Sequence, residues 1–314
     1  MPPNPFTALV IINPRSRRGS DAEFSDCVSL LTQKGLKIIK VQSHGARLMG
    51  ELIAMHRGRV NLVVLAGGDG TVSSAAEALY QYKLPFAILP MGTANDLARS
   101  LKLPTDLPDA CQAIIANRRQ KIDLAVVNGR YFFNAANLGL GVKVTHELTP
   151  EIKRRWGVFS YLKALFSAMH RKEVFRAIVT IDGKVHRMKS MHIAVGNGRY
   201  YGGGNIIDEN ATINNGLLCL YSLKPQNFWN LLILAPLLRN GKQRRAPTIF
   251  RATGRRIEIR TRRPMEIDAD GEPVAHTPAI FEVLPKALEV IAPGVEAPEK
   301  PVEQKQQTES GVPA

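Results

Sequence analysis

The sequence predicts two domains, an α/β domain with a parallel sheet followed by a mostly antiparallel β-sandwich domain. Three observations lead to this fold class. The 314 residues suit two domains of roughly 150 residues each. Short β-branched runs alternate with helical patterns up to residue 129, and strand-like runs separated by Gly, Asn and Asp dominate after it. We therefore assign residues 1–129 to the α/β domain, 130–293 to the β domain and 294–314 to a disordered tail.

The α/β domain is expected to contain four strands, each followed by a helix. The strands are expected at Ala8–Ile12, Leu36–Val41, Val60–Leu65 and Phe86–Leu89. The helices are expected at Asp21–Lys34, Arg47–Arg57 and Val72–Tyr82, with a fourth from about Asp96. Ligands of such parallel sheets bind in the loops that follow the carboxyl ends of the strands.

The β domain is expected to contain at least six strands. They are predicted at Arg130–Ala135, Arg176–Ile181, Ser190–Val195, Leu217–Ser222, Arg256–Arg260 and Ala279–Leu284. The dipeptides Asp182-Gly183 and Asn215-Gly216 are typical of hairpin turns. A helical stretch at Lys153–His170 and an apolar segment at Phe228–Leu238 interrupt the strands.

Charge and cysteine content limit the partners and the compartment. Lys and Arg number 42 against 27 Asp and Glu, a net charge of +15, which favours nucleotide phosphates, a phospholipid surface or nucleic acid without choosing among them. Three widely spaced cysteines argue against a disulfide framework and a structural zinc site, so a reducing cytosol is the simplest setting. No signal peptide is recognisable, and residues 228–238 are too few to span a bilayer, so we expect a cytoplasmic protein.

The clearest candidate site is the loop Gly67-Gly68-Asp69-Gly70-Thr71, which follows the third strand and opens a helix. Consecutive glycines allow positive φ and let backbone N–H groups approach an anion, and the helix N-terminus adds a favourable dipole. Without a Lys it is not a Walker A loop. Asp69 stands where a phosphate would bind, so Mg²⁺ is expected between the two. The alternative is an ordinary turn with Thr71 as a helix cap.

Two further loops follow strands at the same edge of the sheet. The loop 90–96 (PMGTAND) offers Thr93 to a phosphate, although Thr93, Asn95 and Asp96 also suit a plain N-cap cluster. The loop 13–19 (NPRSRRG) carries three arginines, which suit an anion site or a solvated basic loop.

Together these loops resemble the diacylglycerol kinase catalytic-domain family, and the layout is similar to the soluble bacterial lipid kinases of the YegS type. The resemblance covers about residues 7–292. Later motifs follow the family order: Asn137–Gly141, Gly196–Gly198, Gly202–Gly204, Ala211–Leu217 and Asp270-Gly271-Glu272. The GGDGT element alone is shared with NAD kinases and phosphofructokinases, whose N-terminal fold is expected here. The GTAND continuation and the late DGE favour lipid kinases.

The resemblance implies a kinase that binds ATP and Mg²⁺ on the first domain and phosphorylates a lipid hydroxyl, such as that of diacylglycerol, in the cleft between domains. The nucleotide contacts it implies are Asn13, Ser43, Gly67, Gly68, Asp69, Gly70, Thr71, Thr93, Asn95 and Asp96. Asp69 and Asp96 match aspartates that organise Mg²⁺ and the phosphates. Glu272 matches the proton acceptor, with Asp270 beside it, so Glu272, Asp270 and Asp69 are the candidate catalytic residues.

The sequence departs from the family pattern in two places. Arg17-Arg18 precede Gly19 where the family usually has Ser-Gly directly. The family's structural Mg²⁺ site in the second domain has an Asp at the place of Asn215, and a neutral Asn binds Mg²⁺ more weakly. If the site persists, its ligands are the carbonyls of Thr212 and Leu217 together with Asn215.

Two apolar segments beside basic residues are candidates for contact with an anionic membrane surface. Residues 228–238 precede a basic cluster at 239–245, and Lys153-Arg154-Arg155-Trp156 precedes a second apolar stretch. We expect peripheral, reversible membrane association and a lipid substrate, without a nucleic-acid partner; packing of both segments under the β domain is the alternative. The sequence does not indicate the oligomeric state, so a homodimer is neither predicted nor excluded.

Two rival functions also stay open. An NAD kinase shares the GGDGT element, but no fitting NAD-binding continuation follows it. A catalytically inactive member of the fold that binds lipid or nucleic acid suits the positive charge, although the retained Asp69, Asp96 and Glu272 argue against it.

Overall fold

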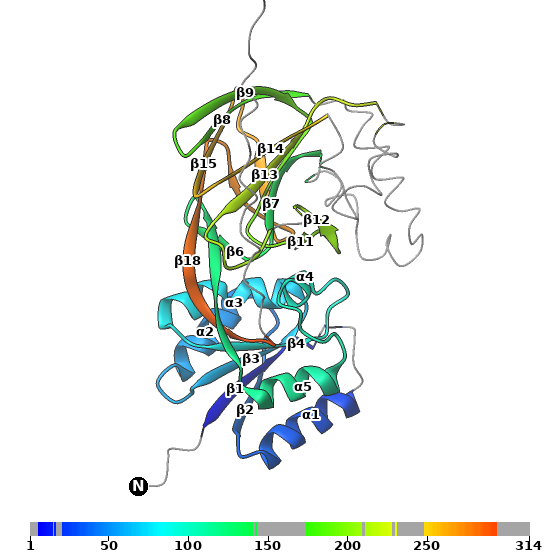
Figure 1. Cartoon of the computed structure of the whole chain (residues 1–314). Coiled ribbons are helices and arrows are strands. Elements are labelled where there is room, and N and C mark those ends of the chain that lie inside the picture. Colours follow the sequence, from blue (N-terminus) through cyan, green and yellow to red (C-terminus); the bar gives the residue numbers. More distant parts are fainter. Residues whose placement is uncertain are drawn as a thin grey trace, which may run out of the picture.

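The computed structural model of the chain describes residues 6–14, 16, 21–140, 142, 174–208, 211–227, 230 and 248–293. The expected helix at 153–170, nearly all of the apolar segment 228–238, the arginines of the first loop and the tail lie outside these residues. The described chain forms an α/β half and a β-sandwich half (Figure 1), which is the fold class that the sequence predicts.

The α/β half is built on four parallel strands in the order β2-β1-β3-β4. These strands are β1 (Thr7–Ile12), β2 (Lys37–Gln42), β3 (Leu62–Gly67) and β4 (Phe86–Pro90). The helices of this half are α1 (Asp21–Gln33), α2 (Ala46–His56), α3 (Asp69–Tyr82), α4 (Asp96–Ser100) and α5 (Leu107–Ala116). Alternate strand residues face opposite sides, so Leu9 and Val63 pack with α2 and α3, whereas Ala8 and Val64 pack with α1 and α5.

The β half consists of two packed sheets. The first extends the parallel sheet and contains β5 (Arg119–Val127), β6 (Arg130–Phe132), β8 (Phe175–Ile181), β9 (Lys184–Ser190), β15 (Arg256–Thr261) and β18 (Ala279–Ile291). The second contains β7 (Ala135–Gly139), β10 (His192–Gly196), β13 (Leu218–Leu223), β14 (Ile249–Gly254), β16 (Glu266–Ala269) and β17 (Glu272–His276). A small hairpin of β11 (Tyr200–Tyr201) and β12 (Asn205–Ile206) stands apart. Val179, Ile193 and Phe281 belong to the core between the two sheets.

Strand β18 joins the two halves. Val290 near its end pairs in parallel with Phe86 of β4, whereas Phe281 near its start pairs with Val127 of β5 and Ile257 of β15. Figure 1 shows this strand curving from the β-sandwich down to the α/β half. The two halves are therefore joined by hydrogen bonds between strands, as well as by the chain segments that pass from one half to the other.

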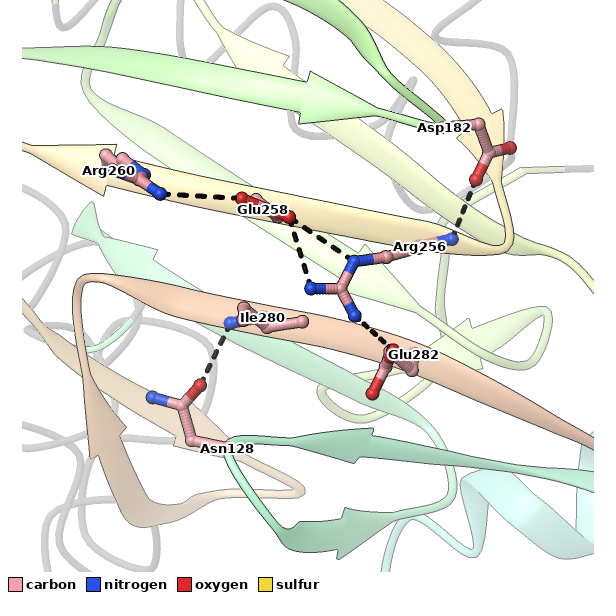
Figure 2. A network of polar contacts seen from close by, with 7 residues as sticks. All are labelled: Asn128, Asp182, Arg256, Glu258, Arg260, Ile280 and Glu282. Atoms are coloured by element: carbon pink, nitrogen blue, oxygen red, sulfur yellow. Dashed lines mark hydrogen bonds and ion pairs between the residues drawn. The ribbon is translucent and has the colours of Figure 1, made fainter.

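Charged residues on β15 and β18 form a balanced network on the shared sheet (Figure 2). Arg256 pairs with Glu258 on its own strand and with Glu282 on β18, and Arg260 lies 3.8 Å from Glu258. Exposed ion pairs contribute little stability individually. Both arginines of this network nevertheless have a carboxylate within ion-pair distance.

The two predicted hairpin dipeptides have different outcomes. Asp182 and Gly183 have φ values of 46° and 86° and connect β8 to β9, as predicted. Asn215-Gly216 is not a hairpin turn, because it lies in an irregular segment before β13, and the partners of β13 in the described residues are β10 and β14. Among the described helices, none is long and apolar enough to cross a membrane.

Candidate active site

The two glycine loops that follow β3 and β4 touch through their backbones. A Cβ added to Gly92 would lie 2.4 Å from the Cα of Gly68, and one added to Gly68 would lie 2.9 Å from the Cα of Gly92. Gly68 has a φ of −96°, so close approach, and not the positive φ expected from the sequence, is what requires glycine there. Gly67 is needed for a similar reason, since its Cβ would lie 2.3 Å from the Thr71 hydroxyl oxygen.

Two asparagines hold these loops in place. Asn13, directly after β1, donates from Nδ2 to Thr71 Oγ1 at 3.0 Å, so the first loop is tied to the GGDGT loop. Asn95 has a φ of 52°; its Oδ1 accepts from the Gly92 N–H and its Nδ2 donates to the Gly92 carbonyl, both at 3.0 Å. In this arrangement Asn13, Thr71 and Asn95 shape the loops, and their side chains bond to protein groups.

The remaining expected nucleotide contacts differ in exposure. Ser43, after β2, is buried, and its hydroxyl donates to the Gly45 carbonyl at 3.1 Å. Gly70 and Thr93 are exposed, and a Cβ at Gly70 would meet no atom within 4 Å. Among the described residues no side chain caps the N-terminus of α3. The N–H groups of Thr71 and Val72 bond to the Gly68 carbonyl, which leaves those of Asp69 and Gly70 for an anion that enters between the loops.

Two aspartates from these loops lie close together. Asp69, the first residue of α3, accepts from the backbone N–H of Leu97 at 3.2 Å. Burial, and then the negative charges of Asp96 and Asp270, raise the pKa of Asp69 to about 6. Asp69 is therefore mainly ionised at neutral pH. Its buried negative charge destabilises the fold, and a bound cation would offset that destabilisation.

Asp96 is buried where the two halves meet. Its Oδ2 accepts from the backbone N–H of Gly203 at 2.8 Å, whereas its buried Oδ1 has no hydrogen-bond partner among the described residues. Burial raises the pKa of Asp96, and the N–H groups of Gly203 and Gly204 and the charge of Arg99 oppose that shift. An unbonded, buried carboxylate oxygen beside a second carboxylate fits Mg²⁺, which takes one or two carboxylates plus substrate phosphates.

Asp270 connects three segments of the chain. It lies in the turn between β16 and β17 with a φ of 49°. Its Oδ2 accepts from the Ser73 hydroxyl of α3 and from the Phe133 N–H at 2.8 Å, and its Oδ1 accepts from the N–H groups of Asn134 at 2.9 Å and Ala135 at 3.2 Å. Burial raises the pKa of this carboxyl, and the four hydrogen bonds oppose the rise. With four donors already bound, Asp270 acts as a positioning residue.

Glu272 begins β17, on the far side of the Asp270-Gly271 turn. The φ values of Asp270 and Gly271, 49° and 91°, suit a type I′ hairpin turn, so this motif is a hairpin as well as a candidate site. Glu272 is exposed, unlike Asp96. A solvent-accessible carboxylate next to an anchored turn can reach a substrate hydroxyl.

A buried hydrogen-bond chain supports the loop that holds Asp96. The Tyr201 and Tyr221 hydroxyls are 2.5 Å apart, and the Tyr221 hydroxyl lies 3.0 Å from His192 Nε2. Burial lowers the pKa of His192 to about 4 and raises that of Tyr201 to about 12, so all three groups are neutral at pH 7. Tyr201 directly precedes three consecutive glycines with positive φ, one of which is Gly203.

The loop expected to hold a second metal is tied down by protein groups. Asn215 Oδ1 accepts from the Leu217 N–H at 3.0 Å. The buried carboxylate of Asp123 accepts from the N–H groups of Gly216 at 2.6 Å and Lys286 at 2.8 Å. No cluster of three or more acidic, His or Cys residues suited to a metal occurs among the described residues. Asn215 is a neutral amide whose Oδ1 already accepts from an N–H, which makes it a weaker ligand for Mg²⁺ than the Asp of the family pattern. The expected site of the Thr212 and Leu217 carbonyls with Asn215 stays a prediction.

The structure adds contacts that the sequence patterns did not indicate. Ser73, Gly203 and Asp123 hold Asp270, Asp96 and the 211–217 loop respectively. Ser73 lies four residues after Asp69 on α3, so helical periodicity could have found it. No local signal marks the contacts of Gly203 and Asp123.

Two family models together match most of the chain. The diacylglycerol kinase catalytic domain matches residues 7–127, and the YegS C-terminal NAD kinase beta sandwich-like domain matches residues 135–292. A protein from Klebsiella pneumoniae (strain 342), named "Probable lipid kinase YegS-like", is 31% identical over 90% of this chain and 94% of its own length. A protein from Escherichia fergusonii, named "Probable lipid kinase YegS", is 32% identical over the same shares.

The chain belongs to the YegS-type lipid kinase family. A crystal structure of a Bacillus anthracis str. Sterne protein assigned to the diacylglycerol kinases is 26% identical, with a TM-score of 0.77 over 91% of this chain and 95% of that chain. A second structure from that organism, of a diacylglycerol kinase, is 24% identical with a TM-score of 0.72 over 91% and 96%, and shows the fold alone. As a lipid kinase, the chain is an ATP-using phosphotransferase with an alcohol group as acceptor, so the lipid-kinase prediction is confirmed over the NAD kinase alternative.

Proposed function

We propose that this lipid kinase transfers the γ-phosphoryl group of Mg²⁺-bound ATP to a hydroxyl of a glycerolipid such as diacylglycerol. The observation that carries the proposal is the meeting of Asp69 and the half-bonded Asp96 with the anchored Asp270-Glu272 turn. The proposal is supported by hydrogen bonds that connect the elements carrying the two aspartates, the N-terminus of α3 and the exposed Glu272.

Each group has a distinct part in the proposed reaction. Backbone N–H groups at the start of α3 bind the phosphates, helped by the helix dipole. Asp69 and Asp96 would hold Mg²⁺, which when bound neutralises phosphate charge as the phosphoryl group moves through a loose transition state. Glu272 accepts the proton of the attacking hydroxyl, and Asp270 fixes the turn that carries Glu272.

The test is phosphorylation of a total lipid extract with γ-labelled ATP, with the product named by mass spectrometry. Glu272→Gln is expected to lower turnover at least 100-fold, because it removes the proton acceptor. Glu77→Gln changes an exposed glutamate of α3 by the same chemistry and is expected to keep wild-type turnover. Equal turnover in the two variants, or a labelled product that is not a lipid, contradicts the proposal.

We also propose that the enzyme binds anionic bilayers reversibly. The net charge of +15 supports this, and the two apolar segments considered for the contact lie mainly outside the described residues. Co-sedimentation with phosphatidylglycerol-containing vesicles, compared with phosphatidylcholine alone, is the measurement. Equal recovery with both vesicle types would rule out an electrostatic contribution.

A further inference from the structure

A cavity of about 480 Å³ lies far from the active site, where the C-terminal end of α3 meets β5 and β18. Its walls include the apolar side chains of Leu79, Leu84 and Leu288. Asp69 and this cavity lie at opposite ends of α3, which is about 20 Å long. The volume is in the range of small-molecule binding sites. A ligand bound here would not contact the glycine loops of the active site.

Three lysines, Lys83, Lys121 and Lys286, also line this cavity. They come from the C-cap of α3, from β5 and from β18, so the tertiary fold, and not a run of sequence, brings them together. All three are exposed, and none of the ammonium groups has an ion-pair partner among the residues that the structure describes. The cations in the network of Figure 2 are different, because each has a glutamate beside it.

The one carboxylate in the cavity wall does not balance these charges. Glu289 lies opposite Lys121 in the pairing of β18 with β5. Its carboxylate is bound by Arg119 at 2.8 Å, outside the cavity lining. The wall itself carries three lysines against one glutamate, a net charge of +2 around one concave surface, which favours an anion.

The backbone at two of the lysines adds a second observation. Lys83 and Lys286 both have a φ of 52°, a left-handed conformation that Gly and Asn adopt with less strain. Lys83 ends α3, and Lys286 lies in a bulge of β18 whose N–H is fixed by Asp123. Apart from Lys102, the other non-glycine residues with positive φ in the described chain are Asn or Asp. Both residues have a backbone role, because the Lys83 N–H caps the C-terminus of α3 and the Lys286 N–H bonds to Asp123, so the positions from which both side chains extend are fixed.

We propose that this cavity, which we call the three-lysine cavity, binds a phosphate-bearing anion at a site separate from the active site. The three ammonium groups bind the phosphate oxygens, beside a largely buried apolar wall that includes Leu84 and Leu288. A phosphate of this kind can belong to a free small molecule or to the headgroup of an anionic lipid. The chemistry is shared, so the experiment separates the two sources.

The first arm is calorimetric titration of the full chain with inorganic pyrophosphate in EDTA, where the metal-free carboxylates of the active site repel the probe. Wild type is expected to bind saturably, and the triple variant K83Q/K121Q/K286Q at least about tenfold more weakly. The control variant K37Q/K184Q/K189Q removes three exposed lysines from β2 and β9 and is expected to match wild type. Circular dichroism checks that both variants are folded.

The second arm is flotation with phosphatidylcholine vesicles that carry phosphatidic acid or an equal charge of phosphatidylglycerol. Binding that the triple variant loses and pyrophosphate competes away assigns the cavity to a lipid phosphate; pyrophosphate binding without such vesicle binding assigns it to a free anion. Absence of saturable pyrophosphate binding, or equal loss in the triple and control variants, overturns the proposal. Neither arm needs kinase activity, so its outcome is independent of the proposed reaction.

Discussion

The hydroxyl of Ser73 donates to the carboxylate of Asp270 across a separation of 197 residues in the sequence. Ser73 lies one helical turn after Asp69, and Asp270 lies in the turn that leads to Glu272. One hydrogen bond thus connects the helix that begins at the phosphate-binding loop with the hairpin that carries the proposed proton acceptor. Weakening it should affect catalysis more than stability.

Ser73→Ala tests this connection. Asp270 keeps its three backbone N–H donors, so we expect a loss of stability of only about 1 kcal/mol. Turnover should fall about tenfold with little change in the KM for ATP, since the variant displaces Glu272 and leaves the phosphate loops intact. The control is Thr32→Val, which removes an exposed hydroxyl bond on α1. A loss of ATP affinity without a loss of turnover would contradict this role.

Gly92→Ala should disrupt the contact between the glycine loops. The new Cβ would meet the Gly68 Cα at 2.4 Å and the Asn95 Oδ1 at 2.6 Å, so the loops must separate. We expect a destabilisation of about 1–3 kcal/mol and weaker ATP binding. Gly70→Ala adds the same methyl group in open space and should change stability far less. Urea denaturation and nucleotide titration measure both effects.

Asp69 makes stability depend on pH in a defined direction. Its pKa is raised to about 6 in the folded state, so the folded protein binds a proton more tightly than the unfolded chain does. The ionised carboxylate therefore destabilises metal-free enzyme above pH 6, and this penalty disappears as the pH falls from 6 towards 4. We expect Asp69→Asn to melt at a higher temperature than wild type at pH 7.5 in EDTA, with the difference shrinking by pH 4.5.

The same Asp69→Asn variant should lose kinase activity while gaining stability. Mg²⁺ should raise the melting temperature of the wild type with ATP, and raise that of the variant much less, because one proposed cation ligand is gone. A variant that is less stable than wild type at pH 7.5 in EDTA would mean that Asp69 is structurally required.

Asp123 should anchor the 211–217 loop without a metal. Asp123→Ala leaves the N–H groups of Gly216 and Lys286 without their acceptor, and we expect a loss of about 2–4 kcal/mol. Asn215→Ala removes one acceptor, that of the Leu217 N–H, and should cost less. Removal of metal with EDTA should leave the melting temperature of the nucleotide-free enzyme unchanged; a marked drop would indicate a structural cation in this loop.

Tyr201→Phe tests the buried hydroxyl chain. The Tyr221 hydroxyl would lose its neighbour but keep His192, so we expect a destabilisation of about 0.5–1.5 kcal/mol. Tyr200→Phe, at the preceding residue, removes a hydroxyl outside this chain and is the matched control. Urea denaturation of both variants gives the comparison, and equal stabilities would show that the chain contributes nothing.

The fold class and the clustering of the loops could be predicted because both depend on local patterns. Alternation of β-branched runs with helical periods indicates a parallel sheet, and the carboxyl ends of its strands bring Asn13, Gly68 and Gly92 to one edge. Helix α5 was not predicted, although Asp106 accepts from the Asp109 N–H as an ordinary N-cap with Pro108 in the first turn. That signal was present in the sequence.

Other features depend on contacts between distant residues and had no local signal. The pairing of Val290 with Phe86 requires the last strand to return to the first sheet. The role of Gly68 differs from the expectation because the neighbouring loop, and not its own φ, excludes a side chain. The assignment of Asp270 to positioning depends on donors from residues 73 and 133–135, which the DGE motif alone does not reveal.

The curved strand β18 has a consequence for how substrates enter. Because its two ends are hydrogen-bonded into different halves, the halves are not free to swing like a door on a hinge. A relative movement of the two halves would therefore have to bend β18 and its neighbour β5, and the register irregularity between Leu284 and Leu288 is where the pairing of these two strands is interrupted.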